Sequence, residues 1–336
     1  MTRKTPTMAD IARETGVSLM TVSRAFKRDG AVGVERRAAI LAVAERLGYV
    51  FDSTASNLRS QRTDFVAVTI PSINNANFAD TVRGLTDGLA ERGLQILLAT
   101  TNYDIHDEER LIEQLLRRRP EAIVVTGGRH TGRARRLLTN AGIPVVETWD
   151  LPADPLGHVV GFSNADAVRG MVDHFVGAGY RRIAFIGGDA DRDTRGTDRR
   201  AGFIAAMSAL GLDATRLIAA GMPPISMREG ADAMALLLTR FPDTEAVICV
   251  SDLSAFGALT ECQRRGVEVP ERIAIAGFGD FELAAVSVPS LTTINAFARD
   301  IGLRAAGVIL DVLDGRQGAP ARVVIAPELI VRGSSR

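Results

Sequence analysis

The chain has 336 residues, of which 46% are hydrophobic and 24% charged, and it carries no net charge. This composition is that of a globular protein long enough for two or three domains. Its two cysteines, Cys249 and Cys262, argue against a disulfide framework or a zinc site and suit a reducing compartment. No apolar run approaches the ~18 residues that cross a membrane, and the basic start has no apolar segment behind it. We therefore expect a cytoplasmic protein without a signal peptide.

The charge is unevenly distributed along the chain. Residues 1–63 contain eleven Arg and Lys against six Asp and Glu, a net charge of +5, which leaves −5 for the remainder. A basic head on an acidic body is typical of a protein that contacts nucleic acid at one end, because phosphate attraction is the sequence-independent part of such binding.

Residues 7–27 predict two short helices joined by a tight turn. Thr7 is a candidate N-cap with Asp10 three residues later, and Ser18 can cap the second helix. Gly16 between them supplies the backbone freedom of the turn. The apolar positions expected to pack the two helices together are Met8, Ile11, Ala12, Val17, Val22 and Ala25.

The second helix would expose Leu19, Met20, Thr21 and Arg24. A third helix is expected over residues 34–47. Its expected buried side consists of Ala38, Ile40, Leu41, Ala44 and Leu47. Such a helix-turn-helix inserts its second helix into the major groove, whereas the alternative is a small helical bundle without DNA contacts.

Several strings in this head resemble the lactose-repressor family of bacterial regulators. They are Met8-Ala9-Asp10-Ile11-Ala12, Gly16-Val17-Ser18, Thr21-Val22-Ser23-Arg24, Leu47-Gly48-Tyr49 and Ser56-Asn57-Leu58-Arg59-Ser60. In that family the last string is a hinge helix that forms on operator DNA. Its leucine, here Leu58, wedges into the minor groove.

The resemblance also implies roles in DNA binding for individual residues. Leu19, Met20 and Arg24 would read base edges, and the first two would do so through shape and thymine methyl groups, since they offer no hydrogen bonds. The residues expected to contact phosphates or cap helices are Thr7, Ser18, Thr21 and Ser23, and the hinge adds Leu58 and Arg59. The chain departs from the family after the tyrosine, where Val50-Phe51-Asp52 replaces the usual proline and asparagine.

From residue 64 onward, short apolar runs alternate with amphipathic stretches. Alternation of this kind predicts βαβ units, with helices on both faces of parallel sheets. The expected strands are 65–70, 94–99, 122–125, 144–147, 182–186, 246–250 and 272–278. The expected helices are 78–92, 106–118, 165–178, 199–210, 228–239, 253–265 and 297–313.

The resemblance extends over this body, which looks like a two-lobed periplasmic-binding-protein-like fold. The fold class expected is thus α/β, with an all-α helix-turn-helix head and hinge helix over 1–63 and an effector-binding and dimerisation domain over 64–336. Lobe 1 would comprise about 64–162 plus 292–321, and lobe 2 about 163–291 plus 322–336. The tetramerising helix of the lactose repressor is absent, so we expect a homodimer on a palindromic operator.

A ligand of such a fold binds in the cleft at the carboxyl ends of the strands. The predicted effector-binding residues are Ser72, Asn77, Phe78, Thr126, His130, Trp149, Arg195, Arg199, Ser251, Asp252 and Asp280. Four arginines occur within residues 192–200; they form either a self-paired surface cluster or an anion clamp. The resemblance assigns effector binding to Arg199, three residues before Gly202.

Two departures from the family indicate the charge of the effector. The family's sugar-binding aspartate falls in a Gly-Tyr-Asp string, which here reads Gly277-Phe278-Gly279. Ile225 stands where an aromatic often stacks on the ligand. Loss of a carboxylate beside retained arginines favours an anionic effector, although Asp280, one residue further on, could still accept hydroxyl groups.

Within the family the chain resembles gluconate-utilisation repressors. The shared strings include Pro71-Ser72, Phe78-Ala79, Arg83-Gly84, Ile143-Pro144-Val145-Val146-Glu147, Val160-Gly161-Phe162, Glu261-Cys262-Gln263-Arg264 and Ile273-Ala274-Ile275-Ala276-Gly277-Phe278. A sugar acid such as gluconate is the expected effector, and the alternatives are a neutral sugar or a nucleobase-type corepressor. A cytosolic solute-binding protein is a further alternative. No catalytic motif is present among the four histidines or elsewhere, so we expect no enzyme, no cofactor and no metal.

Overall fold

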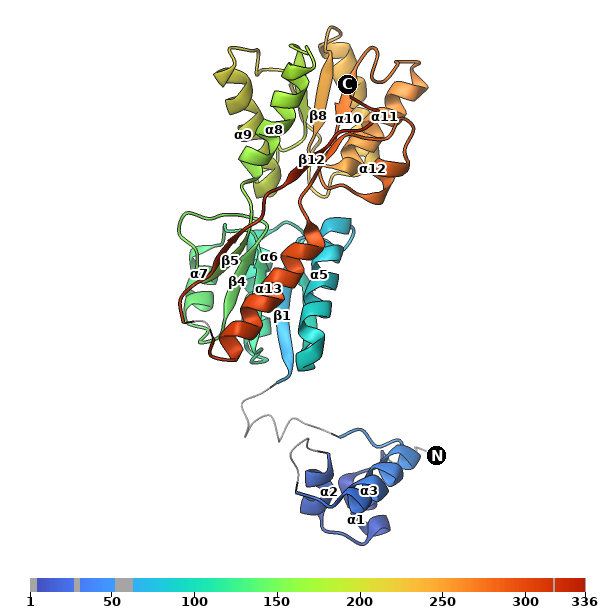
Figure 1. Cartoon of the computed structure of the whole chain (residues 1–336), viewed down its shortest axis with the longest axis vertical. Helices are drawn as coiled ribbons and strands as arrows, with labels where there is room; N and C mark the ends of the chain where they lie inside the picture. The colour runs from blue at the N-terminus through green and yellow to red at the C-terminus, as the bar shows by residue number, and fades with distance from the viewer. Residues whose placement is uncertain (1–4, 27–30, 52–62, 317, 336) are drawn as a thin grey trace. The chain divides into compact units, whose positions relative to one another are not determined.

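The computed structural model describes every residue except 1–4, 27–30, 52–62, 317 and 336. The chain divides into two compact units, Met1–Arg62 and Thr63–Arg336, which are described separately (Figure 1). No helix in the described ranges has the length and apolarity needed to span a membrane.

The first unit contains the three helices that the sequence predicts. They are α1 (Met8–Thr15), α2 (Leu19–Ala25) and α3 (Val34–Leu47). The Asp10 carboxylate accepts hydrogen bonds from the Thr7 backbone N–H (3.0 Å) and hydroxyl (2.7 Å). Gly16 ends α1 with a φ of 65°, and the Ser18 hydroxyl caps α2 by accepting from the Thr21 N–H at 3.2 Å. The local start and stop signals therefore work as predicted.

The core of this unit corrects the expected buried side of α3. Its fully buried members are Ile11, Val22, Ala25, Ile40 and Ala44. Ala38 and Leu41, both predicted to be buried, are exposed. Each residue advances about 100° around a helix, so Leu41 lies a quarter turn or more from Ile40, and Ala38 lies further round. The stripe that packs on α1 and α2 follows Ile40, Ala44 and half-buried Leu47 instead.

The second unit begins with a six-stranded sheet in the order β11-β5-β4-β3-β1-β2, whose neighbours all pair in parallel. The strands are β1 (Phe65–Ile70), β2 (Gln95–Thr100), β3 (Ala122–Thr126), β4 (Val145–Thr148), β5 (His158–Gly161) and β11 (Arg322–Val324). The helices around it are α5 (Ala76–Leu89), α6 (Ile105–Leu116), α7 (Gly132–Thr139) and α13 (Ala298–Leu313), and the short 3-10 helix η1 (Ala90–Arg92) follows α5. We call this part lobe 1.

Alternating side chains of β1 serve the two faces of that sheet. Val66 and Val68 belong to the core that includes residues of α5 and α13. Ala67, between them, belongs to a separate core with residues of α6 and α7. Helices α5 and α13, far apart in sequence, lie side by side (Figure 1). A period of two along a strand that is buried on both faces accounts for its continuous apolar sequence.

Lobe 2 is built on a four-stranded parallel sheet in the order β7-β6-β8-β9. Its strands are β6 (Ile183–Ile186), β7 (Leu217–Ile218), β8 (Ala246–Cys249) and β9 (Ala274–Ala276). Its helices are α8 (Asn164–Gly177), α9 (Thr194–Ala209), α10 (Met227–Arg240), α11 (Asp252–Arg264) and α12 (Glu282–Val286). The predicted alternation of strands and helices is confirmed, although α7, α12 and the short strands β5 and β7 were not predicted.

The C-terminal segment corrects the predicted lobe boundary. β10 (Thr293–Asn295) and β12 (Glu328–Ile330) form a separate antiparallel pair. Residues 322–324, assigned to lobe 2 from the sequence, form β11, which pairs with β5 in the sheet of lobe 1. Pairing with a strand more than 150 residues away leaves no local signal in the sequence. The predicted return of the chain to lobe 2 at residue 322 is therefore too early, because the chain leaves lobe 1 only after β11.

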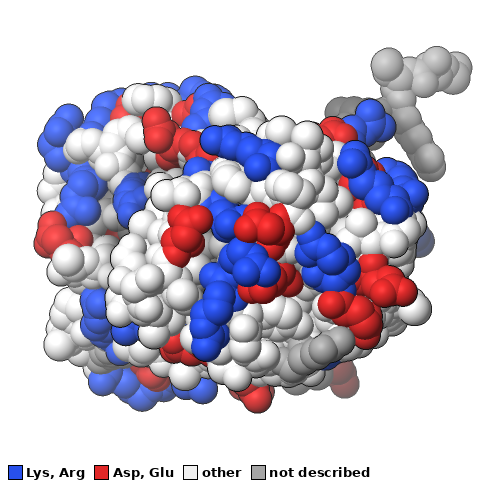
Figure 2. Space-filling model, turned by 90° about the horizontal axis from the view of Figure 1, so that it is seen from above, with Lys and Arg blue, Asp and Glu red and all other residues white. Residues whose placement is uncertain are grey.

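Charged side chains of both signs are intermixed over the face seen in Figure 2, where arginines lie beside Asp and Glu. Ion pairs between neighbouring side chains are frequent in the second unit, for example Arg169–Asp166 on α8 and Arg304–Asp300 on α13. Opposite charges in contact cancel each other's field, so on this face the excess of acids forms no extended patch of one sign.

Candidate functional site

The first candidate site is the outer face of α2. Leu19 and Met20 are 52% and 63% exposed. Arg24 is also exposed, and its side chain makes no ion pair or hydrogen bond with any residue that the structure describes. Val22 and Ala25 on the opposite side are fully buried. The helix therefore presents two apolar side chains and a free cation to solvent, the face a recognition helix needs.

The other predicted DNA contacts surround this face or fall outside the described residues. Thr7 and Ser18 cap α1 and α2, and Thr21 and Ser23 are partly exposed on α2. Leu58 and Arg59 lie outside the described residues, so the hinge wedge stays a prediction.

The unusual residues after Tyr49 are partly explained by packing. The ring of Phe51 stacks on that of Phe26, with centroids 4.9 Å apart and planes at 11°. Tyr49 also contacts Phe26, at 5.8 Å. An offset aromatic stack of this kind adds stability beyond its buried area, so Phe51 anchors the end of this unit where the family usually has proline and asparagine.

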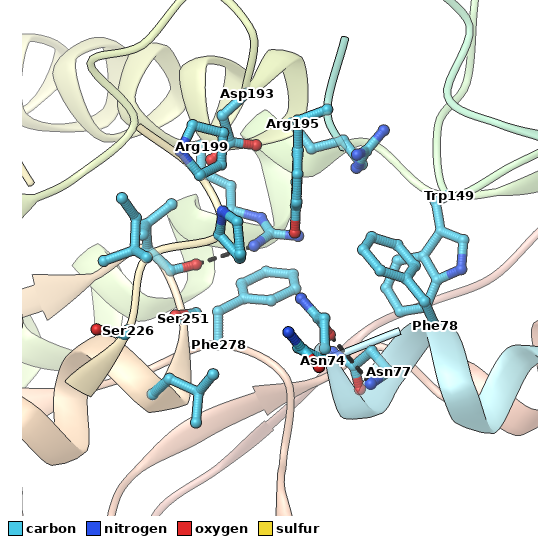
Figure 3. A pocket seen from close by; sticks show the side chains of 17 residues that line it. Asn74, Asn77, Phe78, Trp149, Asp193, Arg195, Arg199, Ser226, Ser251 and Phe278 are labelled. Carbon is cyan, nitrogen blue, oxygen red and sulfur yellow. Dashed lines mark hydrogen bonds between the residues drawn. The ribbon is translucent and has the colours of Figure 1, made fainter. Parts of the chain in front are cut away.

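The second candidate site is a cavity of about 170 Å³ in the second unit, lined by residues of both lobes (Figure 3). Lobe 1 contributes Asn74, Asn75, Asn77, Phe78, Tyr103 and Trp149. Lobe 2 contributes Asp193, Arg195, Arg199, Pro223, Pro224, Ile225, Ser226, Val250, Ser251, Leu253 and Phe278. Many of these residues follow the carboxyl ends of parallel strands, which is where ligands of such folds bind.

Aromatic rings form one wall of the cavity. Trp149 is 1% exposed and meets Phe78 and Phe162 edge-on, with centroids 5.4 and 5.8 Å away. Phe162 in turn stacks on Phe278 at 6.1 Å. The Trp149 indole N–H donates to the Thr81 hydroxyl at 3.0 Å. This indole is therefore fixed in the wall, with its polar atom already satisfied.

Arg199, on α9, is held by neutral groups. Its Nε donates to the Asn164 side-chain oxygen and its Nη1 to the Val250 carbonyl, both at 2.9 Å. The guanidinium carbon lies 3.5 Å from the centroid of the Phe278 ring. Burial lowers the pKa of Arg199 to about 10, although the nearby Asp193 carboxylate acts in the opposite direction. Arg199 remains a cation at neutral pH in surroundings that disfavour one.

Arg195 lies one turn earlier on the same face of α9 and is 6% exposed. Its guanidinium lies 5.5 Å from the centroid of the Phe78 ring, and its Nη1 is 3.5 Å from the Thr126 carbonyl. Among the described residues, neither Arg195 nor Arg199 has a carboxylate oxygen within 4 Å. Asp193 lines the same cavity, but its Oδ1 is engaged by the Gly196 N–H at 3.0 Å. Two guanidinium groups against one carboxylate suit an anionic ligand.

The structure brings six of the eleven predicted effector residues to this cavity: Asn77, Phe78, Trp149, Arg195, Arg199 and Ser251. Two others lie close by in lobe 1 but are engaged with the backbone. The Ser72 hydroxyl accepts from the Asn74 N–H at 3.2 Å, and the Thr126 hydroxyl donates to the Thr69 carbonyl at 2.9 Å. Their side chains stabilise the strand ends and do not line the cavity.

His130 also lies away from the cavity, contrary to the prediction. Its side chain is fully buried, with Nδ1 2.8 Å from a Glu108 oxygen and Nε2 3.5 Å from a Glu147 oxygen. Burial alone would lower its pKa, but the two glutamates outweigh burial and raise the pKa to about 9. His130 is therefore an internal cation of lobe 1. The sequence missed this because both glutamates belong to other elements.

Asp252 and Asp280, which were also predicted to bind the effector, do not line the cavity. Their carboxylates bind other parts of the protein instead. Asp252 is fully buried and accepts from the Phe281 N–H (2.8 Å) and the Thr293 hydroxyl (2.6 Å). Burial raises its pKa to about 6 in spite of these bonds. Asp280 forms an ion pair with Arg332 at 2.6 Å and accepts from the Asn295 amide at 3.0 Å. Both tie loops of lobe 2 to β10, and Asp280 also binds the segment that follows β12.

Sequence reasoning missed several lining residues, chiefly Tyr103 and the loop Pro223, Pro224 and Ser226. Tyr103 had a usable signal, because it closely follows the predicted strand 94–99 and so belongs to the carboxyl edge of the sheet. The proline loop follows β7, which has two residues and left no recognisable strand pattern in the sequence.

Known families match parts of both units of the chain. Residues 7–52 match the model of bacterial regulatory proteins of the lacI family, and residues 172–335 match a periplasmic binding protein-like domain. The chain is 34% identical over 330 residues to the HTH-type transcriptional regulator GntR of Pseudomonas aeruginosa, covering 98% of this chain and 96% of that relative.

Two solved structures extend the likeness to the whole chain. A LacI-family transcriptional regulator from Silicibacter pomeroyi superimposes with a TM-score of 0.91 at 32% identity, covering 98% of this chain and 99% of that one. A complex of the transcriptional regulator CelR with cellobiose has a TM-score of 0.71 at 29% identity and covers 98% and 99% of the two chains. The predicted family is confirmed: the chain belongs to the LacI family and is a DNA-binding transcriptional regulator.

Proposed function

We propose that this regulator is a repressor that binds a palindromic operator as a homodimer and is released by a sugar acid such as gluconate. The observation that carries the effector proposal is the pair Arg195 and Arg199. Both face the cavity, and among the described residues neither has a carboxylate within ion-pair distance. A ligand carboxylate supplies the missing partner, because charge-assisted bonds to a guanidinium are strong and can be bidentate.

The remaining lining residues suit the polyol part of such a ligand. Asn74, Asn75, Asn77, Ser226 and Ser251 place amides and hydroxyls around the same space. These groups both donate and accept hydrogen bonds, as sugar hydroxyls require. The resemblance to gluconate-utilisation repressors points to the same class of ligand.

Gly279 supports an acid over a neutral sugar. A Cβ built there would lie 2.6 Å from the Phe281 ring and 2.7 Å from the Asn77 amide nitrogen, at a φ of +133°. Side chains rarely adopt that conformation. The position therefore has no room for the aspartate that the family uses to accept sugar hydroxyls.

A neutral sugar is the second candidate, since the related CelR was solved with cellobiose and the asparagine-rich loop needs no charge on its ligand. A nucleobase-type corepressor remains the third. The charge of the ligand separates the first two: an acid depends on the arginines, whereas a neutral sugar depends mainly on the amides.

Release of DNA is proposed to follow from a shift between two arrangements of the lobes. Effector binding would change how lobe 1 of each protomer presents its hinge helix to the partner protomer. A coupling of about 1–3 kcal/mol between the two sites corresponds to roughly 5–150-fold in operator affinity. Because we propose an inducer, operator affinity should fall when the effector binds.

The test is calorimetric titration of the full chain with D-gluconate and, separately, with D-glucose. Arg199→Ala should weaken gluconate binding by tenfold or more, since a bond to a charged group contributes about 1.5–3 kcal/mol. Arg200→Ala is the matched control, because the neighbouring Arg200 donates to the Gly187 carbonyl and does not line the cavity. Equal gluconate affinity in the Arg199 variant, or tighter binding of glucose than of gluconate, would overturn the sugar-acid proposal.

A further inference from the structure

The segment that carries the two cavity arginines is also held from the opposite lobe. Arg192, just before α9, forms an ion pair with Asp104 of lobe 1. Arg129 of lobe 1 forms an ion pair with Asp198 on α9. One cation thus comes from each lobe and binds an acid of the other, and we call these two contacts the inter-lobe pairs.

Additional bonds anchor both pairs. Arg129 also donates through Nη1 to the Thr194 carbonyl at 3.2 Å, at the start of α9. The other oxygen of Asp104 caps α6 by accepting from the His106 N–H at 2.8 Å. Three of the four paired residues, Asp104, Arg129 and Arg192, line one small space of about 30 Å³ together with Thr194 and Arg195 among others. They therefore lie together at one edge of the cleft.

Each inter-lobe pair is adjacent in sequence to a residue that lines the effector cavity. Asp104 follows Tyr103, Arg192 precedes Asp193, and Asp198 precedes Arg199. These neighbours are joined by one peptide bond, so a separation of the lobes that breaks the pairs must also move the cavity walls.

The backbone before Asp104 is consistent with such a constraint. Asn102 and Tyr103 are consecutive non-glycine residues in the left-handed region, with φ of 51° and 60°. Such conformations are unfavourable and persist where the surrounding structure over-determines them. The α6 cap and Arg192 together hold the end of this loop through Asp104.

We infer that the inter-lobe pairs Arg192–Asp104 and Arg129–Asp198 hold the cleft closed and position Tyr103, Arg195 and Arg199 around the effector. None of their four residues lines the cavity itself, so they act as positioning residues. Because apparent affinity falls in proportion to the fraction of molecules in the competent state, weaker pairs mean weaker effector binding. The closure does not depend on the proposed function; only the ligand used in one arm of the test does.

The experiment reverses the charges of the inter-lobe pairs and measures resonance energy transfer between dyes on the two lobes. Dyes are attached to Thr139→Cys on α7 and Ser208→Cys on α9, two exposed positions in different lobes. The native Cys249 and Cys262 are buried and escape labelling. Labelled protein is mixed with excess unlabelled protein so that transfer occurs within one chain. Arg129→Asp and Asp198→Arg each place like charges face to face, and the double variant restores attraction with reversed polarity.

Each single variant should lower the transfer efficiency, and the double variant should restore it. Arg192→Ala should also lower it. The control Arg169→Asp places like charges together in an exposed pair within α8, where Arg169 lies 3.1 Å from Asp166. This control should leave the transfer efficiency unchanged. Unaltered efficiency in the single variants, or no recovery in a folded double variant, would show that the pairs do not hold the cleft closed.

A parallel titration with D-gluconate measures the consequence for the site. Each single variant should bind at least fivefold more weakly than the parent, and the double variant should return to within about twofold. Wild-type affinity in every single variant would refute the positioning role. If the parent chain fails to bind gluconate, the proposed effector is wrong, while the energy-transfer result still decides the closure.

Discussion

The most informative single residue outside the two sites is His130. An imidazolium enclosed by Glu108 and Glu147, with its side chain fully buried, contributes to stability only while it is protonated. Its folded pKa of about 9 lies above the ordinary value near 6.5. The contribution is therefore fully present below pH 6.5 and is lost as the pH rises through about 9.

We expect the free energy of unfolding of the second unit to fall by about 3 kcal/mol at most between pH 6.5 and 10, from a shift of this size. Urea unfolding across that range measures it. His130→Gln removes the titrating group, so its pH profile should be flatter than that of the parent chain, and its stability lower at pH 6.5. Parallel profiles for the two proteins would show that His130 is not the source of the dependence.

At the scale of elements, the close packing of α5 on α13 depends on two glycines. A Cβ at Gly84 would lie 2.1 Å from the Arg299 carbonyl oxygen, and one at Gly302 would lie 2.1 Å from the Thr81 carbonyl oxygen. Backbone atoms cannot move aside as a side-chain tip can. These helices therefore lie closer together than any larger residue permits at either crossing point.

Gly84→Ala should destabilise the second unit by about 1–3 kcal/mol, the usual range for overpacking. Gly170→Ala is the control, since a Cβ there meets nothing within 4 Å. At this exposed position of α8, Gly170→Ala should stabilise the unit by roughly 0.5–1 kcal/mol through helix propensity. Denaturant midpoints of the two variants should thus move in opposite directions, and a Gly84 variant as stable as the parent would contradict the close contact.

At the scale of the whole molecule, the proposed homodimer needs an apolar surface. Val286, which ends α12, and Val288 are 70% and 78% exposed. Two large apolar side chains this exposed and this close in sequence suit an interface better than open solvent. We propose that they contribute to the contact between protomers.

Val286→Asp combined with Val288→Asp should then shift the protein toward monomer in sedimentation analysis. It should also weaken operator binding strongly, because two half-sites must be bound together. Gluconate binding within each protomer should persist. Leu210→Asp, at a 46% exposed position after α9, controls for added charge. A double variant that remains dimeric would place the interface elsewhere.

The sequence by itself determined the features that depend on near neighbours. The three helices of the head, strand β1 and the outer face of α2 follow from caps, turns and periodicity within a few residues. The cluster of four arginines over residues 192–200 is visible in the same way, whereas the assignment of Arg199 to the effector comes from the resemblance to the family. These signals are local, so they survive without knowledge of the fold.

Only the tertiary structure decided which polar residues are free to bind. Asp280 is engaged by Arg332, 52 residues away, and Asp252 by Thr293, 41 residues away. His130 is enclosed by glutamates from α6 and β4. Gly279 has no room for a side chain because Asn77 packs against it. Burial and pairing arise between segments distant in sequence, whereas composition and spacing report what each segment could do alone.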